Sequence, residues 1–518
     1  ISLKDQTLLI VGIATSINEA FCFVPGEFHH ANEVLRNPEI TKVYHNCFFD
    51  LEVMDTDNRN IGDTLLMAAL LGLPEKKLSK VAEQIYNEQW GPLVPTFEMG
   101  KVLDEFHTKT CDKMPEISLA DKCNLDTRST FNAYNSLLPL LTDNQFEAYD
   151  TDVRLIPILL RLTRRGIRLD QTQLAVLSVE YEAKANKYRE LCQRHGLENP
   201  GSPKQVAEIL MNRGVLFPRR VRGKWVISTD KDILKYIPDI LAQLVLKFRN
   251  ANYFLTHYVR PWIGEERAYT HFHLNAKTSR MSSTGTEANK VDRNLMNIPS
   301  IKKDPEQGRA RTCFIPDSGH FTLADASQMQ LRILAHLSQD PVMLRIYDED
   351  GDIHQETADF FQMPRNTIIK SVNFGMVFGA TAQTLMETAN ITDKGLAENL
   401  MHLWGKKYKR AWEWIQYQQK EGARAGVVYT SFGRPLYIPQ DKGRAHAERC
   451  AVNYPIQGTE AESIKRWLAA CDDTGKFDLA HVVHDEGIFD GYYDDLPSID
   501  DFTPYRCPMN ISHVERWQ

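Results

Sequence analysis

Cysteine pairs, long apolar runs and a strong charge of one sign are all missing from this sequence. Its nine cysteines include no C-x-x-C pair, which argues against a disulfide framework or a structural zinc site and fits a reducing, intracellular setting. There is no run of about 18 apolar residues and no charged-then-apolar leader, so the sequence predicts neither a membrane span nor a signal peptide. The formal net charge of −7 argues against a uniformly basic nucleic-acid binder.

Basic residues do gather in four short clusters. Any one such cluster is more often a solvated surface than a phosphate contact, and only clusters that share a surface would indicate nucleic-acid binding. The clusters are TRRGIR (163–168), PRRVRGKW (218–225), KFRN (247–250) and WGKKYKRAW (404–412).

The chain is long enough for several hydrophobic cores. With 518 residues and 42% hydrophobic content, two to four domains are expected. Residues 1 to about 145 alternate strand and helix patterns, with buried strands expected at 7–14 and 21–24, a strand and then a helix at 40–54, and helices at 61–72 and 125–141. Further on, the pattern predicts helices over 146–270, a strand at 320–325, helices at 327–339 and 353–424, and strands near 427–438 and 479–489. The predicted fold class is a multidomain mixture of α/β and α+β.

The stretch HVVHDEGIFDG (481–491) carries the first functional signal, because charged residues separate two apolar strands. An ordinary surface hairpin explains it, since a turn exposes Asp and Gly to water without cost. Alternatively, Asp485 and Glu486 on a rigid hairpin bind a metal ion together with a third carboxylate. Asp325 is the candidate, because it ends an apolar strand just before a helix. Asp325 could instead cap that helix, although Ser327 could fill this role and leave Asp325 available.

A cationic group for a phosphate is offered by PRNTIIKSVNFGMVFGAT (364–381). On a helix, Lys370, Phe374 and Phe378 recur every four residues and share one face. A lysine beside two aromatic rings can hold a phosphate and stack on a base. The alternative is a core helix whose lysine reaches out to solvent, and the pattern does not decide between the two.

Six segments of the sequence, in this order and at these separations, resemble motifs of family A DNA polymerases, the group of bacterial DNA polymerase I and its phage relatives. Motifs A, B and C are matched by DASQMQLRILAHLS (325–338), KSVNFGMVFG (370–379) and VVHDE (482–486). The other three matches are TSRMSSTGTEANKVDRNLMNIPS (278–300), DIHQETA (352–358) and AERCAVNYPIQGTEAE (447–462). The resemblance covers nearly the whole chain, and six motifs in register make a chance match negligible.

The resemblance implies an RNase H-like 3′–5′ exonuclease domain at residues 1–145 and a right-hand polymerase domain at 146–518. Within the polymerase, it places the thumb at about 165–270, the palm at about 271–345 and 425–518, and the fingers at about 346–424.

The resemblance also implies roles for individual residues. Asp325 and Asp485 would bind two Mg²⁺ ions, with the carbonyl of Ala326 helping and Glu486 nearby. Lys370 would contact the triphosphate and protonate the leaving pyrophosphate, with His354 beside it. The other nucleotide-binding residues would be Gln328, Gln330, Arg365, Phe374 and Phe378. The DNA-binding residues would be Arg280, Asn294, Arg449, Asn453, Gln457 and His484.

Three departures from the family pattern surround the nucleotide pocket. Gln330 stands where motif A usually has the Glu that excludes a ribose 2′-hydroxyl, and Phe378 stands where Tyr is usual, so the usual Tyr–Glu contact cannot form. Gln has a similar volume, so exclusion of ribose can persist. Asn366 replaces the usual Arg of motif B, and Arg365 substitutes only if the helix entry bends, since one helical position is about 100° of rotation. Altered substrate preference and drift both explain these changes.

The N-terminal region resembles a DEDD-type 3′–5′ exonuclease. HNCFFD supplies Asn46 and Asp50, DKCNLDTRST supplies Asp126, and Asp63 is a further candidate. The usual Tyr of the third motif is Lys122 here, and the first motif would lie upstream of Ile1. Two more Mg²⁺ ions are expected if this site is complete, and a decayed structural domain is the alternative.

The leading hypothesis is a DNA-templated DNA polymerase that adds dNTPs to a primer on template DNA. We expect a cytoplasmic monomer without a membrane contact or a thioredoxin site. The Ala326 form of motif A and the lack of an N-terminal 5′-nuclease favour a phage replicative enzyme acting in the host cytoplasm. Gln330 and Phe378 keep a single-subunit RNA polymerase open as an alternative. A non-catalytic DNA-binding relative is disfavoured by the intact Asp325, Asp485 and Lys370.

Overall fold

A computed structural model describes the chain over residues 8–54, 59–92, 94, 116–221, 224–274, 277–285 and 292–518. It forms two compact units. The first unit takes in the described residues up to Arg165, then His271–Ser283 and Thr322–Ser512. The second comprises Gly166–Thr270, Thr284–Phe321 and His513–Gln518. Over the described residues, no helix has the length and apolar character needed to cross a membrane.

The N-terminal part of the first unit contains two small sheets with covering helices. β1 (Val11–Ala14) and β2 (Ala20–Phe23) form an antiparallel hairpin. β3 (Lys42–Tyr44) and β4 (Ile61–Asp63) pair in parallel, which requires the crossover that contains α2 (Cys47–Leu51). The other elements of this part are α1 (Phe28–Leu35), α3 (Thr64–Leu70), α4 (Leu78–Asn87), α6 (Glu116–Leu137) and η2 (Leu138–Leu140).

Two expectations for this part are corrected by the structure. The first hairpin is not fully buried: Val11 packs against α1 and Gly12 lies against α6, but Phe21 remains 49% exposed. The segment 61–72 is not helical throughout. It begins as β4, and Asp63 then caps α3 by accepting hydrogen bonds from the backbone N–H groups of Leu65 and Leu66.

A four-stranded sheet lies at the centre of the rest of the first unit, with the strand order β14–β15–β11–β16. Its strands are β11 (Phe321–Ala326), β14 (Leu479–Val483), β15 (Glu486–Asp490) and β16 (Met509–Val514). The long helix α20 (Arg444–Asp473) packs on this sheet, and its Trp467 meets Phe489 of β15 edge-on at 5.7 Å between ring centroids. Both rings are fully buried, so the sheet is firmly held from this side.

Buried charges tie α20 to α7 (Asp143–Arg165). Asp152 accepts hydrogen bonds from Arg434 at 2.9 Å and from Lys465 at 2.5 Å. Arg434 also pairs with Glu462 at 3.1 Å, and Lys465 donates to the hydroxyl of Ser279 at 2.9 Å. Burial alone would raise the pKa of Asp152, but the two cations outweigh burial and hold it below its ordinary value. Removing any one partner would leave a buried charge uncompensated.

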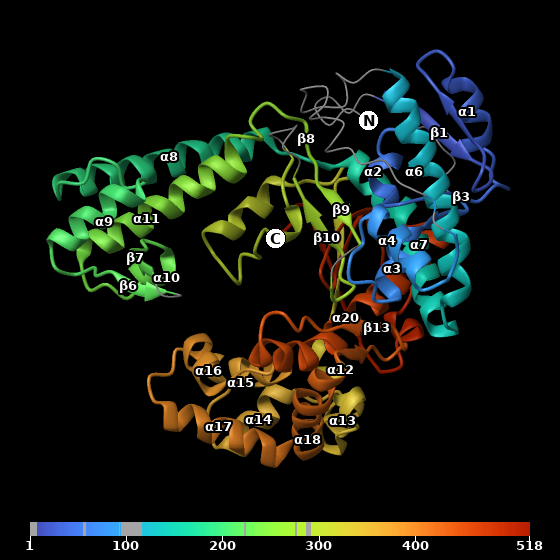
Figure 1. Ribbon diagram of the computed structural model, residues 1–518. Helices are drawn as coiled ribbons and strands as arrows, with labels where there is room; N and C mark the ends of the chain where they lie inside the picture. The colour runs from blue at the N-terminus through green and yellow to red at the C-terminus, as the bar shows by residue number, and fades with distance from the viewer. Residues whose placement is uncertain are drawn as a thin grey trace. The chain divides into compact units, whose positions relative to one another are not determined.

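A group of helices follows the central strand β11 in the sequence, as the pattern over 353–424 predicts (Figure 1). They are α12 (Met329–Ser338), α13 (Pro341–Asp348), α14 (Ile353–Phe361), α15 (Thr367–Val377), α16 (Ala382–Ala389), α17 (Lys394–Lys407), α18 (Lys409–Tyr417), η6 (Gln418–Gly422) and α19 (Ala423–Ala425). The remaining elements of this unit are β9 (His271–His273), β10 (Ser282–Thr284), β12 (Val427–Tyr429), β13 (Pro435–Tyr437) and η7 (Ile499–Phe502).

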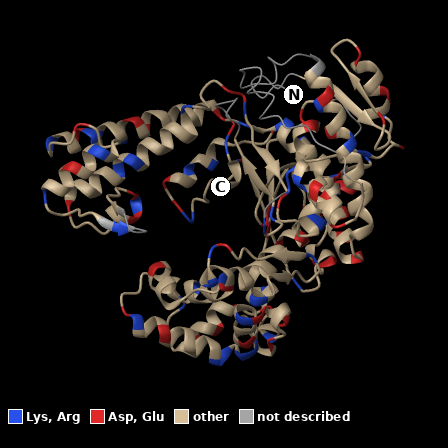
Figure 2. Cartoon of the chain, viewed as in Figure 1, with Lys and Arg blue, Asp and Glu red and all other residues tan. Residues whose placement is uncertain are grey.

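The second unit is built on two long helices that pack together, α8 (Gln171–Arg194) and α11 (Ile240–Phe254) (Figure 1). Its smaller elements are β5 (Ile167–Arg168), α9 (Pro203–Asn212), β6 (Arg219–Val221), β7 (Lys224–Val226), α10 (Lys231–Leu234), η3 (Leu255–Val259), β8 (Arg267–Ala268), η4 (Leu295–Asn297) and η5 (Gln307–Cys313). Figure 2 shows acidic and basic positions interspersed along α8, so the net negative charge is not concentrated on this helix.

Candidate active site

The hairpin that carries Asp485 is a tight two-residue turn. Val483 pairs with Glu486 across it, leaving His484 and Asp485 at the tip. His484 adopts a left-handed conformation, with φ of 55°. The strands on either side are buried at Val482, Ile488 and Phe489. The hairpin is therefore anchored in the core by its two strands, while His484 at its tip is exposed.

Asp325 and Asp485 are brought together by the pairing of β11 and β15. The backbone N–H of Ala326 donates to the carbonyl of Asp485 at 3.2 Å, which fixes the end of β11 against the hairpin tip. Burial raises the pKa of Asp485 to about 7, and the charges of Glu460 and Asp325 add to this effect, while Arg280 opposes it. Negative charge is thus concentrated at one point of the sheet.

The start of α12 differs from both sequence predictions for it. Neither Asp325 nor Ser327 caps the helix, because the N-cap position is Gln328, in a left-handed conformation and without a side-chain cap. The helix therefore begins without the side-chain cap that the sequence suggested.

The donor set at this point fits a divalent cation of the Mg²⁺ type. Carboxylates are hard oxygen ligands, and Mg²⁺ is commonly held by one or two of them, with water and substrate phosphates completing its shell. No ready-made set of three or more His, Cys, Asp or Glu side chains that could hold a metal ion is found over the described ranges. Asp325 and Asp485 would therefore hold an ion only together with water, backbone oxygens or phosphate, and its charge would relieve the crowding that raises the pKa of Asp485.

Lys370, Phe374 and Phe378 are on the accessible side of α15, and Phe378 is 37% exposed. The opposite side, with Ile369, Val372, Met376 and Val377, is buried. The helix therefore uses its other face for the core, which leaves the lysine and the two rings available to a ligand. Phe378 is the C-cap residue, one position beyond the last helical residue.

His354 is buried, and its protonation state follows from its neighbours. The indole of Trp404 donates to Oδ1 of Asn373 at 2.9 Å, so the amide nitrogen of Asn373 must face the Nδ1 atom of His354, also at 2.9 Å. That ring nitrogen accepts, which leaves a proton on Nε2. Burial lowers the pKa of His354 to about 4, and the charges of Arg365 and Lys370 act in the same direction. His354 is a neutral hydrogen-bond donor at physiological pH.

The entry to α15 shows how the chain accommodates its departure from motif B. Asn366 caps the helix by accepting from the N–H of Ile369 at 3.2 Å. Arg365 lies outside the helix and pairs with Asp352 at 2.7 Å. Asp352 in turn caps α14 by accepting from the N–H of His354. Arg365 is therefore held beside His354 rather than on the face of Lys370.

The predicted DNA-binding residues have different environments. Arg280 is ion-paired with Glu460 of α20. Asn453 and Gln457 are half-buried on α20, and Oδ1 of Asn453 is buried without a hydrogen-bond partner among the described residues. Arg449 on the same helix and His484 at the hairpin tip are exposed. Asn294 belongs to the second unit, where it is the N-cap residue of η4.

The candidate exonuclease residues gather around β4 and α6. Burial raises the pKa of Asp50 to about 7, and the charge of Asp63 adds to this. Asp63 accepts backbone N–H groups from four residues, Asn46, Cys47, Leu65 and Leu66, so its carboxylate organises two helix starts. Asn46 has a left-handed conformation at the N-cap of α2. Asp126 is paired with Lys122, one helical turn earlier, at 2.5 Å.

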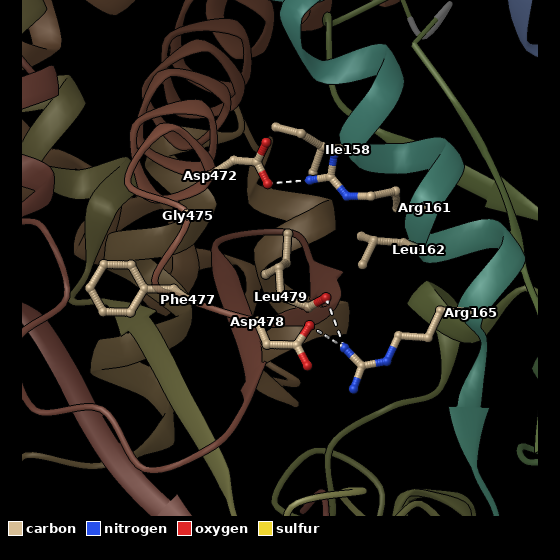
Figure 3. A pocket seen from close by; sticks show the side chains of 9 residues that line it. All are labelled: Ile158, Arg161, Leu162, Arg165, Asp472, Gly475, Phe477, Asp478 and Leu479. Atoms are coloured by element: carbon tan, nitrogen blue, oxygen red, sulfur yellow. Dashed lines mark hydrogen bonds and ion pairs between the residues drawn. The ribbon is translucent and has the colours of Figure 1, made fainter. Parts of the chain in front are cut away.

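One cleft, with a volume of about 570 Å³, lies between α7 and the start of β14 (Figure 3). Ion pairs close it, with Arg161 reaching Asp472 and Arg165 reaching Asp478. Arg165 also holds Asp490 of β15 at 2.6 Å. The lining contains none of the predicted site residues, and its charges serve the packing of α7 on the sheet.

Comparison with known proteins identifies the family to which the chain belongs. Residues 171–504 match the family model for DNA polymerase family A. The chain belongs to DNA polymerase family A. Residues 1–141 match the family model for a 3′-5′ exonuclease, so this family A chain carries that domain at its N-terminal end. The order of the two matches agrees with the exonuclease and polymerase domains expected from the motifs.

The similar proteins include bacterial enzymes. The chain is 30% identical to DNA polymerase I of Caldicellulosiruptor bescii over 70% of its length, and 31% identical to the thermostable DNA polymerase I of Thermus filiformis over 68%. These matches cover 45% of each relative, so the chain spans about half the length of the curated relatives it matches. The POL domain of Pol1 from M. smegmatis, solved in complex with DNA primer-template and dNTP, superimposes with a TM-score of 0.75 at 20% identity, over 96% of this chain and 90% of that one. That likeness supports the fold.

Glu460 is a residue at this site that sequence reasoning missed. It follows the QGT segment of α20 directly, is 2% exposed, and contacts both Arg280 and Gln330. The only signal in the sequence was a carboxylate among apolar and small residues in a helix next to a recognised motif. Its partners come from segments 180 and 130 residues away, which spacing does not reveal.

Proposed function

We propose that this chain is a DNA-templated DNA polymerase that extends a primer 3′ end with dNTPs. The observation that carries the proposal is the junction of β11 and β15, where the Ala326–Asp485 backbone hydrogen bond aligns two aspartates beside further negative charge. Family membership supports the reaction class, and the exposed Lys370 face of α15 supports binding of a nucleotide triphosphate.

Each residue of the proposed site would have its own role in binding or catalysis. Asp325 and Asp485, with the carbonyl of Ala326, would hold two Mg²⁺ ions, which in such sites activate the attacking hydroxyl and neutralise charge on the leaving group. Lys370 would contact the triphosphate, and His354, kept neutral, would donate Nε2–H to an acceptor there. Phe374 and Phe378 would stack on the nucleotide, and Gln330 would border its sugar. Arg449, Asn453, Gln457 and His484 would contact the primer-template, with Gln328 and Glu486 flanking the metal site.

Primer extension in Mg²⁺ tests the proposal, with dNTPs and rNTPs offered separately. The wild type should extend the primer with dNTPs, and Asp485→Asn, which keeps the side-chain volume but removes the charge, should lose at least about a thousandfold of that rate. Asp473→Asn, an exposed change near the end of α20, is the matched control and should keep the rate. Extension by rNTPs alone would favour the RNA polymerase alternative. DNA binding without extension by the wild type would favour a non-catalytic relative.

We further propose that the N-terminal domain trims mismatched primer ends, and that Lys122 weakens this activity by neutralising Asp126. The exonuclease family match and the grouping of Asp50 and Asp126 around Asp63 support the proposal. Following release of a terminal mismatched nucleotide from a labelled primer, without dNTPs, tests it, and Asp50→Asn should abolish the release.

The setting of the enzyme is also a proposal. The Ala326 form of motif A supports a phage replicative polymerase, although the relatives named above are bacterial. A DNA polymerase of this kind would work as a monomer on primer-template DNA in the cytoplasm that contains the template.

A further inference from the structure

Glu460 links three parts of the polymerase site from a buried position on α20. Its Oε1 accepts a hydrogen bond from Nε2 of Gln330 at 2.9 Å. Its other oxygen is ion-paired with Arg280. Its charge also contributes to the environment of Asp485. With 2% of its surface exposed, Glu460 has little freedom to leave these partners.

The contact with Glu460 fixes which way the Gln330 amide points. An ionised carboxylate accepts hydrogen bonds and donates none, so only the amide nitrogen of Gln330 can face it. The amide oxygen must then point away from α20. Both the position of the side chain and the chemical identity of its outward end are set by Glu460.

The same contact explains two of the three departures from the family pattern at this pocket, Gln330 and Phe378. A glutamate at position 330 would place a fourth carboxylate at this site, directly against Glu460, whose charge already acts on Asp485, and like charges repel. A neutral side chain with an N–H donor removes that conflict. Phe378 has no hydroxyl to hold position 330 from the side of α15, and Glu460 provides a hydrogen-bonding anchor from the side of α20.

We propose that Glu460 is a positioning residue that acts through Gln330 to set the preference for deoxyribonucleotides over ribonucleotides. The inference rests on the proposed polymerase function and on Gln330 bordering the nucleotide sugar. A glutamine held at both its position and its orientation keeps its volume where a 2′-hydroxyl would lie. A glutamine without this anchor rotates among its rotamers and leaves that space open for part of the time.

The test is a double-mutant cycle read out as sugar preference. For wild type, Glu460→Ala, Gln330→Ala and the double variant, kcat/KM is measured for one dNTP and the matching rNTP on the same primer-template. Glu460→Ala should lower the dNTP-to-rNTP ratio about tenfold, the size expected for losing one hydrogen bond to a charged group. Gln330→Ala should lower it at least as much, and the double variant should match Gln330→Ala, because both changes remove the same restraint.

Two further variants separate this role from simpler ones. Glu460→Gln keeps the volume but lets both amides turn over, so it should lower the ratio by less than Glu460→Ala. Glu448→Ala removes a glutamate from the same helix whose partner is the 88% exposed Arg444, and it should leave the ratio unchanged.

The outcomes distinguish this inference from the function on which it rests. A wild type that does not extend with dNTPs overturns the polymerase function itself. A polymerase in which Glu460→Ala slows dNTP and rNTP use equally, with the ratio intact, overturns the role of Glu460 in sugar preference. Additive losses in the double variant would overturn it as well, because Glu460 would then act through another partner such as Arg280.

Discussion

The chain has two sites built from aspartates, and they differ in the positive charge that lies beside those aspartates. At the proposed polymerase site, the charges of Glu460 and Asp325 act on Asp485, and Arg280, which opposes them, is ion-paired with Glu460. At the exonuclease site, Asp126 has its own cation, Lys122, on the same helix, and Asp63 is occupied by four backbone N–H groups. Asp50 resembles Asp485, since burial raises the pKa of each to about 7.

The difference indicates how each site would respond to a metal ion. The negative charges of Glu460 and Asp325 around Asp485 would favour a divalent cation there, whereas Lys122 would compete with such a cation at Asp126. A cation held by the protein, such as Lys122, would therefore oppose metal binding at an acidic cluster.

Apart from the loss of Asp485, the largest effect is expected at Lys370, the cation that α15 would supply to the proposed polymerase site. Lys370→Met should slow incorporation of a single dNTP by about a hundredfold to a thousandfold, because a preorganised charge facing the triphosphate is lost. Lys370→Arg retains the charge and should recover part of the rate. Single-turnover kinetics at saturating dNTP measure both variants. Equal rates for Lys370→Met and wild type would mean that this face of α15 does not meet the triphosphate.

The free energy of unfolding should depend strongly on the buried ion pairs that join α7 to α20. Asp152→Asn leaves Arg434 and Lys465 buried without their shared carboxylate, so unfolding should become easier by about 3–5 kcal/mol. The matched change Asp473→Asn, in an exposed pair with Arg154, should stay within about 0.5 kcal/mol. Urea denaturation followed by tryptophan fluorescence compares them. Similar midpoints for both variants would show that the buried network is not what joins α7 to α20.

At the exonuclease site, removing Lys122, the cation paired with Asp126, should increase the affinity for a divalent metal ion. Lys122→Met removes the cation paired with Asp126, and Mn²⁺ should bind there about tenfold more tightly, because an opposing charge has been removed. Calorimetric titration with Mn²⁺ measures this, in the Asp485→Asn background so that the polymerase site does not contribute. Unchanged affinity would mean that Lys122 does not compete for this carboxylate.

The smallest effect is expected at Phe378. Restoring the family's usual residue with Phe378→Tyr should change dNTP-to-rNTP preference by less than about threefold, because Gln330 already has its hydrogen-bond partner in Glu460. The same change in the Glu460→Ala background should have a larger effect. Steady-state kcat/KM values for both sugars provide the comparison.

Much of the fold could be predicted because local patterns determine it. The β11–α12 segment, the 479–489 hairpin and the helix containing Lys370 all follow from apolar periodicity and turn residues. The first hairpin was harder, because the apolar pattern does not reveal that Phe21 stays half-exposed although helices pack on this hairpin. The beginning of β4 inside an apparently helical segment depends on pairing with β3, which is not a local property.

Some residues of the candidate site could likewise be predicted from the sequence, while several of their contacts could not. Asp325, Lys370 and Asp485 could be nominated from motifs, since each motif is a contiguous segment. The Gln330–Glu460 contact, the orientation of Asn373 against His354 and the pairing of Arg365 with Asp352 could not. Each joins side chains from different elements, and each depends on which atom faces which neighbour. Which atom donates and which accepts in such contacts follows only from the three-dimensional structure.

The most direct test of the account is to count bound metal ions. Electron paramagnetic resonance of Mn²⁺, with primer-template and a non-hydrolysable dNTP analogue present, would compare wild type with Asp325→Asn and Asp485→Asn. The account predicts that either variant loses tightly bound Mn²⁺ relative to wild type, although the two aspartates come from segments far apart in the sequence. Equal numbers of tightly bound ions in all three proteins would contradict a metal site at the junction of β11 and β15.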